Sequence, residues 1–321
     1  MRENPGSDRA RRRPATAGNE GDLTQIKFSQ SPFRQTEASI ICREITRYQR
    51  SNTPKARDHV GKAGMKPSTR ANSKIGADQS LKIEIAACVR LLNMEDLLTY
   101  NGHVSARIPW REDAFVIHSI DAARGSVGPE HMVTLDLDGT VIEAGTDMEP
   151  PSEFYIHSEI YRARPDVNAV AHLHGEYAIA FTLVNGAPLL LVRCDSIRWK
   201  SGIPTHPDPT RIKTVEQGRQ LVGTLSNHDA VLLRAHGSVV VAPDLRGVFA
   251  SSIQFEENAR AQVLAATLGQ VTPLNDAEIE AQSSGSSPAF MKHYDAKIWR
   301  YYVQKGLAEG LLPEAWSSHL I

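Results

Sequence analysis

The chain has 321 residues and a formal net charge of −1, from 36 Lys and Arg against 37 Asp and Glu. This balance excludes a globally basic nucleic-acid-binding protein and an acidic, solvated chain. No run of 18 apolar residues predicts a membrane span, and the first thirty residues lack the apolar segment of a secretory signal. The three cysteines are widely spaced, which favours neither a disulfide framework nor a thiolate zinc site. We therefore expect a cytoplasmic protein without a membrane or nucleic-acid partner.

The N-terminal quarter differs from the rest in charge and composition. Residues 1–80 carry a net charge of +8 and are rich in Arg, Ser, Pro, Gly and Asn. Their few apolar residues follow no sustained period, so they cannot bury enough surface to offset the entropy lost on ordering. We expect residues 1–79 to form a basic, mostly disordered tail.

From Ser80 onward the sequence alternates between helical and strand-like segments. A helix capped by Ser80 is predicted by apolar residues on one helical stripe: Leu81, Ile85, Cys88, Leu91 and Leu92. Short apolar runs predict strands at 115–117, 133–135, 169–171, 189–192, 231–233 and 239–241, and helices are expected at 153–163, 177–183, 214–225 and 245–268. This order predicts a layered α/β domain over residues 80–270. Residues 271–321 are expected to form a helical extension behind a flexible Ser-Ser-Gly-Ser-Ser linker.

Two histidines follow an apolar run in the segment Ala-Val-Ala-His-Leu-His. His172 and His174 are two residues apart, and side chains at that spacing point to the same face of a strand. Two imidazoles side by side are a suitable start for a divalent metal site. His236 follows another predicted strand and precedes Gly237, where the backbone can turn sharply, so it is a candidate third ligand. Two histidines at this spacing also occur without a metal.

A carboxylate is expected close to the beginning of a helix. Ser152 can cap this helix after a Pro-Pro pair, which puts Glu153 in its first turn. Glu153 is a candidate acid/base, although it can also simply complement the helix dipole. His157 lies one turn further on, as a packed or supporting histidine rather than a ligand.

Five motifs in this order resemble the class II aldolase/adducin family. They are Gly-His-Val-Ser-Ala-Arg at 102–107, Pro-Pro-Ser-Glu-Phe-Tyr-Ile-His at 150–157, Arg-Pro-Asp-Val at 164–167, Ala-Val-Ala-His-Leu-His at 169–174 and Arg-Ala-His-Gly at 234–237. The resemblance covers residues 80–270. It implies a three-layer α/β/α fold around a central mixed β-sheet, a small-molecule substrate and a homotetramer with sites between subunits. It also implies a divalent ion, Fe²⁺, Zn²⁺ or Mn²⁺, held by His172, His174 and His236, with Glu153 as the catalytic acid/base.

The segments that hold phosphate in the family's sugar-phosphate aldolases are altered here. His103 stands in place of an Asn, and Pro151 in place of one of two serines before the Glu. The Thr/Ser-Gly turn of the family is replaced by a segment that contains Arg124. These changes favour a non-phosphorylated acid, and the residues expected to bind it are His103, Ser105, Arg124 and Ser152.

Several functions fit this pattern. The first is metal-dependent cleavage of a C–C bond, by decarboxylation of a hydroxyaromatic or 2-oxo acid. The alternative is an Fe²⁺/O₂-dependent oxygenase that oxidatively decarboxylates an aryl-pyruvate acid. The altered motifs also resemble those of family members that act in this way in aminocoumarin antibiotic pathways. An aldolase or epimerase and a non-catalytic adducin-like module are further alternatives.

Overall fold

The computed structural model describes residues 70–321. Most of the tail expected at 1–79 therefore lies outside the described residues. Every element below lies within residues 67–321, which form one compact unit. Among the described helices none is long and apolar enough to cross a membrane.

A single mixed sheet of eight strands is the centre of the described region. Its strand order is β4-β3-β2-β1-β5-β8-β7-β6, and only the β6–β7 pair is parallel. The strands are β1 (His103–Ile108), β2 (Arg111–His118), β3 (Met132–Asp136), β4 (Val141–Glu143), β5 (Ala169–Leu173), β6 (Thr205–His206), β7 (Ala230–Leu233) and β8 (Gly237–Ala242). Strand β5 is central, so its side chains meet helices on both faces.

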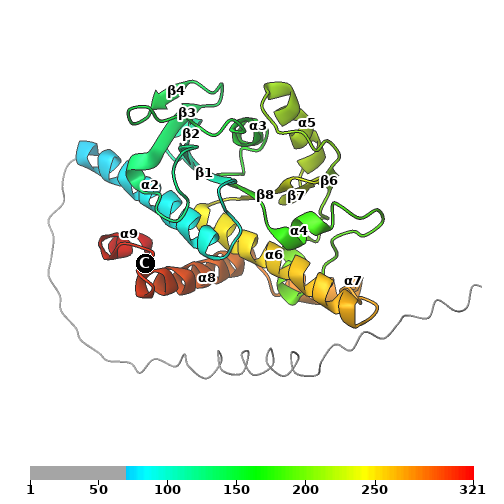
Figure 1. Cartoon of the computed structure of the whole chain (residues 1–321). Helices are drawn as coiled ribbons and strands as arrows, with labels where there is room; N and C mark the ends of the chain where they lie inside the picture. Colours follow the sequence, from blue (N-terminus) through cyan, green and yellow to red (C-terminus); the bar gives the residue numbers. More distant parts are fainter. Residues whose placement is uncertain (1–69) are drawn as a thin grey trace, which may run out of the picture. The chain divides into compact units, whose positions relative to one another are not determined.

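Helices cover the sheet on two sides (Figure 1). They are α2 (Arg70–Met94), α3 (Tyr155–Ala163), α4 (Glu176–Ala180), α5 (Val215–Leu225), α6 (Leu245–Leu268), α7 (Asp276–Ser284), α8 (Pro288–Ala308) and α9 (Ser317–Leu320). Three short 3₁₀ segments, η1 to η3, lie at Pro129–His131, Cys194–Trp199 and Glu314–Trp316. One hydrophobic cluster joins α2, α6 and α8 to the sheet, and a second joins α3 and α5 to the opposite face. The expected three-layer α/β/α fold with a central mixed sheet is confirmed.

The alternation of side chains along β5 explains how one strand serves both layers. Ala169, Ala171 and Leu173 belong to the cluster under α2 and α6, whereas Val170 belongs to the cluster under α3 and α5. His172 has the parity of Val170 and is fully buried. His172 therefore points to the side of the sheet that carries α3 and α5.

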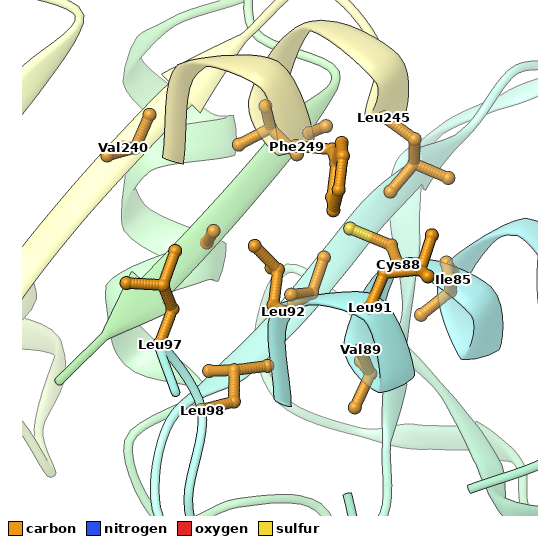
Figure 2. Close-up of a cluster of buried hydrophobic side chains, with 14 of the residues drawn as sticks. Ile85, Cys88, Val89, Leu91, Leu92, Leu97, Leu98, Val240, Leu245 and Phe249 are labelled. Carbon is orange, nitrogen blue, oxygen red and sulfur yellow. The ribbon is translucent and has the colours of Figure 1, made fainter. Parts of the chain in front are cut away.

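Helices α2 and α6 form the larger core (Figure 2). Leu91 and Leu92 of α2 pack with Leu245 and Phe249 of α6, and all four side chains are buried. Burial of a side chain of this size is worth about 1.5–3 kcal/mol. This packing fixes α6 against β5 and β8, the two strands that lead to the predicted metal ligands.

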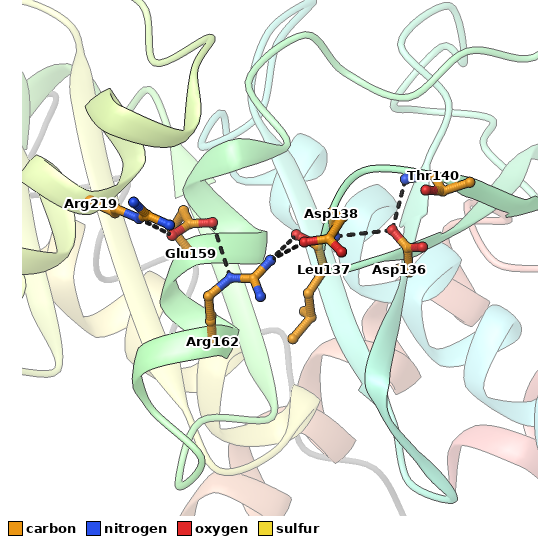
Figure 3. Close-up of polar contacts among 7 residues, drawn as sticks. All are labelled: Asp136, Leu137, Asp138, Thr140, Glu159, Arg162 and Arg219. Atoms are coloured by element: carbon orange, nitrogen blue, oxygen red, sulfur yellow. Dashed lines mark hydrogen bonds and ion pairs between the residues drawn. The ribbon is translucent and has the colours of Figure 1, made fainter.

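A buried carboxylate ties α3 to its surroundings on the other face (Figure 3). Glu159 of α3 lies 3.3 Å from Nε of Arg162 and 3.3 Å from Nε of Arg219 on α5. Arg162 also reaches Asp138, in the β3–β4 turn, at 2.7 Å. Two guanidinium groups offset the cost of burying Glu159, and α3 is held between the sheet edge and α5.

Most predicted elements agree with the structure, with corrections at two helix N-termini, in the linker and in one strand. Helix α2 begins at Arg70, so Ser80 lies inside it and its hydroxyl contacts His319 instead of capping. Helix α3 begins at Tyr155 without a side-chain cap, so Ser152 does not cap it and Glu153 lies in the turn before it. Two of the linker serines belong to α7.

The run at 189–192 is not a strand. Its main-chain groups bond to amide side chains of α6: Leu190 N–H donates to Gln262, and Val192 N–H donates to Asn258. The amide of Asn258 in turn donates to the carbonyl of Leu190. Because these side chains satisfy the backbone, the segment needs no neighbouring strand.

Candidate metal centre and active site

Three histidines meet at one end of the β5–β8 pair. His172 is the buried second-last residue of β5, His174 directly follows the strand, and His236 directly precedes β8. One ring nitrogen from each lies within 4.8 Å of the others. The Nε2 atoms of His172 and His174 are 3.0 Å apart, and the ring of His236 is 4.8 Å from the ring of His172. The structure therefore brings together the three side chains that the sequence predicts as ligands.

The main chain of β8 sets the tautomer of His172. Its Nδ1 lies 3.1 Å from the carbonyl oxygen of Ser238, which can only accept a hydrogen bond. Nδ1 therefore carries the proton, and Nε2 directs its lone pair toward His174. A hydrogen bond of this kind on the far nitrogen is the usual support of a metal-binding imidazole.

Burial keeps the three imidazoles neutral. It lowers the pKa of His172 well below the ordinary value, and the neighbouring imidazoles lower it further. Burial lowers the pKa of His174 to about 4, and the nearby charges of His236 and Arg211 act in the same direction. Burial also lowers the pKa of His236, against the opposite effect of Glu153. Neutral imidazoles have the free lone pair that a metal ion needs.

Glu153 faces this cluster from the turn before α3. Its Oε1 is 3.7 Å from Nε2 of His236 and accepts a hydrogen bond of 3.0 Å from the main-chain N–H of Ile212. The side chain is 12% exposed. A carboxylate oxygen thus lies beside the histidines and keeps an edge open to a ligand in the cavity.

His174, His236 and Glu153 line a cavity of about 310 Å³, and His172 is buried behind them. Tyr100, Pro209 and Arg211 are among the residues at its wall. Arg211 is exposed, makes no hydrogen bond or ion pair with any described residue, and acts electrostatically on His174 and His236. The cavity therefore combines a histidine cluster, a carboxylate and one uncommitted positive charge.

The family profile described as "Class II Aldolase and Adducin N-terminal domain" matches residues 83–263. The chain belongs to the class II aldolase/adducin family. Membership supports a lyase-type enzyme, and the His/Glu cluster is a place where the described residues can hold a divalent metal.

Relatives within this family carry different activities in their names. A 3,4-dihydroxyphthalate decarboxylase of Rhodococcus jostii is 26% identical over 66% of this chain and 88% of its own. A 4-hydroxy-3-prenylphenylpyruvate oxygenase/4-hydroxy-3-prenylbenzoate synthase of Streptomyces roseochromogenus subsp. oscitans is 28% identical over 58% of this chain and 68% of its own. The structure of an L-fuculose 1-phosphate aldolase from Glaciozyma antarctica superposes with a TM-score of 0.65 at 24% identity. This superposition covers 77% of this chain and 96% of the other, and it shows the shared fold.

The donor set of this class II aldolase/adducin chain fits a divalent ion. Nε2 of His172 is unprotonated and lies 3.0 Å from Nε2 of His174, so its lone pair needs a proton or a cation there. Imidazole nitrogens with a carboxylate oxygen suit Zn²⁺, Fe²⁺ and Mn²⁺ alike. The donors therefore support a metal site without selecting the ion.

The residues expected to bind substrate are not equivalent in the structure. His103, Arg124 and Ser152 line the cavity. Ser105 does not: its hydroxyl is fully buried between His157 and Tyr161. Arg124 directs most of its N–H groups to main-chain carbonyls, including those of Gly102, Ile120 and Ala122. Its guanidinium thus supports the loop that leads into β1.

Arg211 is the residue that the sequence did not single out. It lies in a Pro-rich loop between β6 and α5, where an exposed arginine looks like an ordinary solvated charge. Its neighbour Ile212 holds Glu153 through the main chain, and this contact across 59 residues brings the loop to the cavity. No local pattern reports such a contact, so the sequence alone carries no signal for it.

Proposed function

We propose that this protein catalyses the metal-dependent decarboxylation of a non-phosphorylated hydroxyaromatic or 2-oxo acid. The observation that carries the proposal is the convergence of three neutral imidazoles and Glu153 on a cavity that also contains the unpaired charge of Arg211. Each of these groups has a separate task in breaking the bond between a carbon and its carboxyl group.

The proposed metal ligands are His172, His174 and His236. A bound divalent ion would polarise a hydroxyl or carbonyl oxygen of the substrate and stabilise the negative charge that develops as the C–C bond breaks. Three neutral ligands leave the ion its full charge. The carboxylate of Glu153 lies beside these three histidines, 3.7 Å from Nε2 of His236.

The protein's own residues handle the acid and the proton. Arg211 pairs with a carboxylate of the substrate, which orients the molecule in the cavity. As the carboxyl group departs as CO₂, its bonding electrons stay on the substrate carbon, and Glu153 delivers a proton to that carbon. Glu153 then recovers a proton from solvent, so one proton is consumed for each CO₂ released.

Two of the relatives and the altered anion-binding segments favour an acid over a sugar phosphate. One relative is named a decarboxylase of an aromatic dihydroxy acid. The guanidinium of Arg124 donates its hydrogen bonds to main-chain carbonyls, so it is not free to bind a phosphate. These features support decarboxylation ahead of the aldolase, epimerase and adducin-like alternatives. We expect a homotetramer, as the family resemblance implies.

A second candidate is an Fe²⁺/O₂-dependent oxygenase. The relative named as a prenylphenylpyruvate oxygenase favours it, and imidazole ligands also suit Fe²⁺. In this reaction an aryl-pyruvate acid would lose CO₂ while O₂ is consumed.

The test combines elemental analysis of the protein as isolated with a screen of hydroxyaromatic and 2-oxo acids in the presence and absence of oxygen. We expect about one divalent ion per chain and CO₂ release without oxygen. Release that strictly requires oxygen would replace the proposal with the oxygenase. A correctly folded protein that holds no ion after incubation with Zn²⁺, Mn²⁺ or Fe²⁺ would support the adducin-like module.

A further inference from the structure

A row of buried polar groups leads from the cavity into the core beneath α3. Nδ1 of His103 lies 2.6 Å from Nε2 of His157, and Nδ1 of His157 lies 2.6 Å from Oγ of Ser105. The same Oγ lies 2.7 Å from the phenol oxygen of Tyr161. All four groups are buried, and of the four only His103 lines the cavity. The row therefore has one end in the site and one end in the core.

The buried end fixes the direction of every hydrogen bond in the row. The one acceptor for the phenol proton of Tyr161 among the described residues is Oγ of Ser105. The reverse direction would leave this proton buried without a partner, which is costly. Tyr161 thus donates to Ser105, and Ser105 donates to Nδ1 of His157.

The same direction of hydrogen-bond donation continues from His157 to His103 at the cavity. His157 accepts at Nδ1, so as a neutral ring it carries its proton on Nε2 and donates to Nδ1 of His103. Burial lowers the pKa of His157 to about 3, so this ring is neutral. A His103 ring that accepts at Nδ1 cannot carry two protons and is neutral as well. His103 must then carry its own proton on Nε2, the nitrogen left for the cavity.

We propose that His103 is a hydrogen-bond donor to the reacting substrate through Nε2–H, and that His157, Ser105 and Tyr161 are positioning residues that fix this tautomer. This inference rests on the proposed function, because the acceptor is an oxygen of the acid that gains negative charge as CO₂ departs. A fixed donor directed at that oxygen stabilises the charge without reorganisation.

The tautomer also separates His103 from the metal ligands. A ring nitrogen of His103 lies within 4.8 Å of a nitrogen of His172 and a carboxylate oxygen of Glu153, so proximity alone makes it a candidate ligand. A protonated Nε2 has no lone pair for a metal. His103 on β1 is therefore a hydrogen-bond donor, whereas the neighbouring His172 on β5 is a proposed metal ligand.

Neutron diffraction from crystals of the deuterated protein tests the tautomer without any activity. We expect deuterium on Nε2 of both His103 and His157, and on Oγ of Ser105 toward His157. Deuterium on Nδ1 of His103 would overturn the proposal. This result is independent of the proposed function, because it needs no substrate.

Variants of His103 test its task. His103→Leu removes the donor, and we expect kcat to fall about 100-fold, as for loss of one donor in an oxyanion hole, with the metal content unchanged. His103→Gln places an amide N–H near the position of Nε2 and should recover part of the loss. Loss of the metal from His103→Leu would show that His103 is a metal ligand and would overturn the proposal. A wild-type kcat in this variant would overturn it as well.

Tyr161→Phe tests the positioning residues, because it removes one hydroxyl and keeps the packing of the ring. We expect a lower kcat with unchanged KM and metal content, and deuterium distributed over both ring nitrogens of His103. The matched control is Tyr294→Phe on α8, which should leave all of these at wild-type values. Deuterium on Nε2 of His103 alone in Tyr161→Phe would contradict the positioning role of Tyr161. If no acid is turned over by the wild type, the proposed function fails while the neutron result still decides the tautomer.

Discussion

Gly237 at the beginning of β8 lies against the carbonyl oxygen of Leu173 in β5, at a distance that no side chain can occupy. A Cβ at Gly237 would be 2.3 Å from that oxygen, and 3.3 Å and 3.4 Å from ring atoms of His172 and His174. The close approach lets His236, the residue before Gly237, meet the other two imidazoles. The glycine of the His-Gly motif is therefore needed for the spacing of the histidines and not only for a turn.

Gly237→Ala should disturb the metal site through the backbone. The added methyl group must push β8 away from Leu173, since main-chain oxygen cannot yield as a flexible side chain does. We expect the metal to bind at least tenfold more weakly, and the free energy of unfolding to fall by about 1–3 kcal/mol. The control is Gly223→Ala on α5, where nothing lies within 4 Å of the new Cβ. Wild-type metal affinity in Gly237→Ala would contradict this account.

His172→Ala should abolish retention of the metal. It removes the ligand whose orientation is set by Ser238 and whose Nε2 lies closest to His174. The readout is metal per chain after gel filtration in metal-free buffer, with circular dichroism as a check on folding. His293→Ala, an exposed histidine on α8, is the control and should bind metal as the wild type does. A folded His172→Ala that retains a full equivalent would remove His172 from the ligand set.

Glu153→Gln should keep the metal and lose turnover. The amide oxygen of Gln can still accept the hydrogen bond from Ile212, so the turn before α3 should stay in place. The amide cannot deliver a proton to the substrate carbon, and loss of a positioned acid typically costs 10²- to 10⁴-fold in rate. Metal content and single-turnover rates measured on the same preparation separate the two effects. Full activity would refute the acid/base role of Glu153.

The fold could be predicted from local patterns, whereas the complete site could not. Strand β5 and the pair His172 and His174 at its end are predictable because apolar runs and two-residue spacing are local signals. Ser105 was expected at the substrate, but its direction into the core depends on the pairing of β1 with β5. Arg211 was missed because its place depends on the contact between Ile212 and Glu153. The segment at 189–192 has the apolar pattern of a strand, but two amide side chains on α6 take the place of a partner strand.

Arg211→Gln should weaken binding of an acid substrate more than it slows the reaction. The guanidinium has no partner among the described residues, so its removal leaves no buried charge behind. Loss of one charge-assisted contact corresponds to about a tenfold rise in KM, or about 1.4 kcal/mol. Arg300→Gln, an exposed residue on α8, is the control for a change in net charge. An equal KM for Arg211→Gln and the wild type would exclude Arg211 from substrate binding.

Acid should destabilise the folded chain through its buried histidines. Burial lowers the pKa of His118 and of His157 to about 3, against an ordinary value of 6.5 that holds in the unfolded chain. Below pH 6.5 the unfolded chain therefore binds protons that the folded chain excludes, so stability is present above that pH and is lost as pH falls toward 3. Each of the two histidines should cost about 1.4 kcal/mol between pH 7.5 and pH 5.5, or about 3 kcal/mol together.

Urea unfolding at these two pH values, on protein freed of metal with a chelator, measures this loss. His118→Asn is the informative variant, because its amide N–H can replace Nδ1–H in the hydrogen bond to the carbonyl of Ser119 and it does not titrate. Its stability should fall by about 1.4 kcal/mol less than that of the wild type over the same interval. Equal losses in the two proteins would mean that His118 is already accessible to protons in the folded state, and its burial in the structure would then have no effect on acid stability.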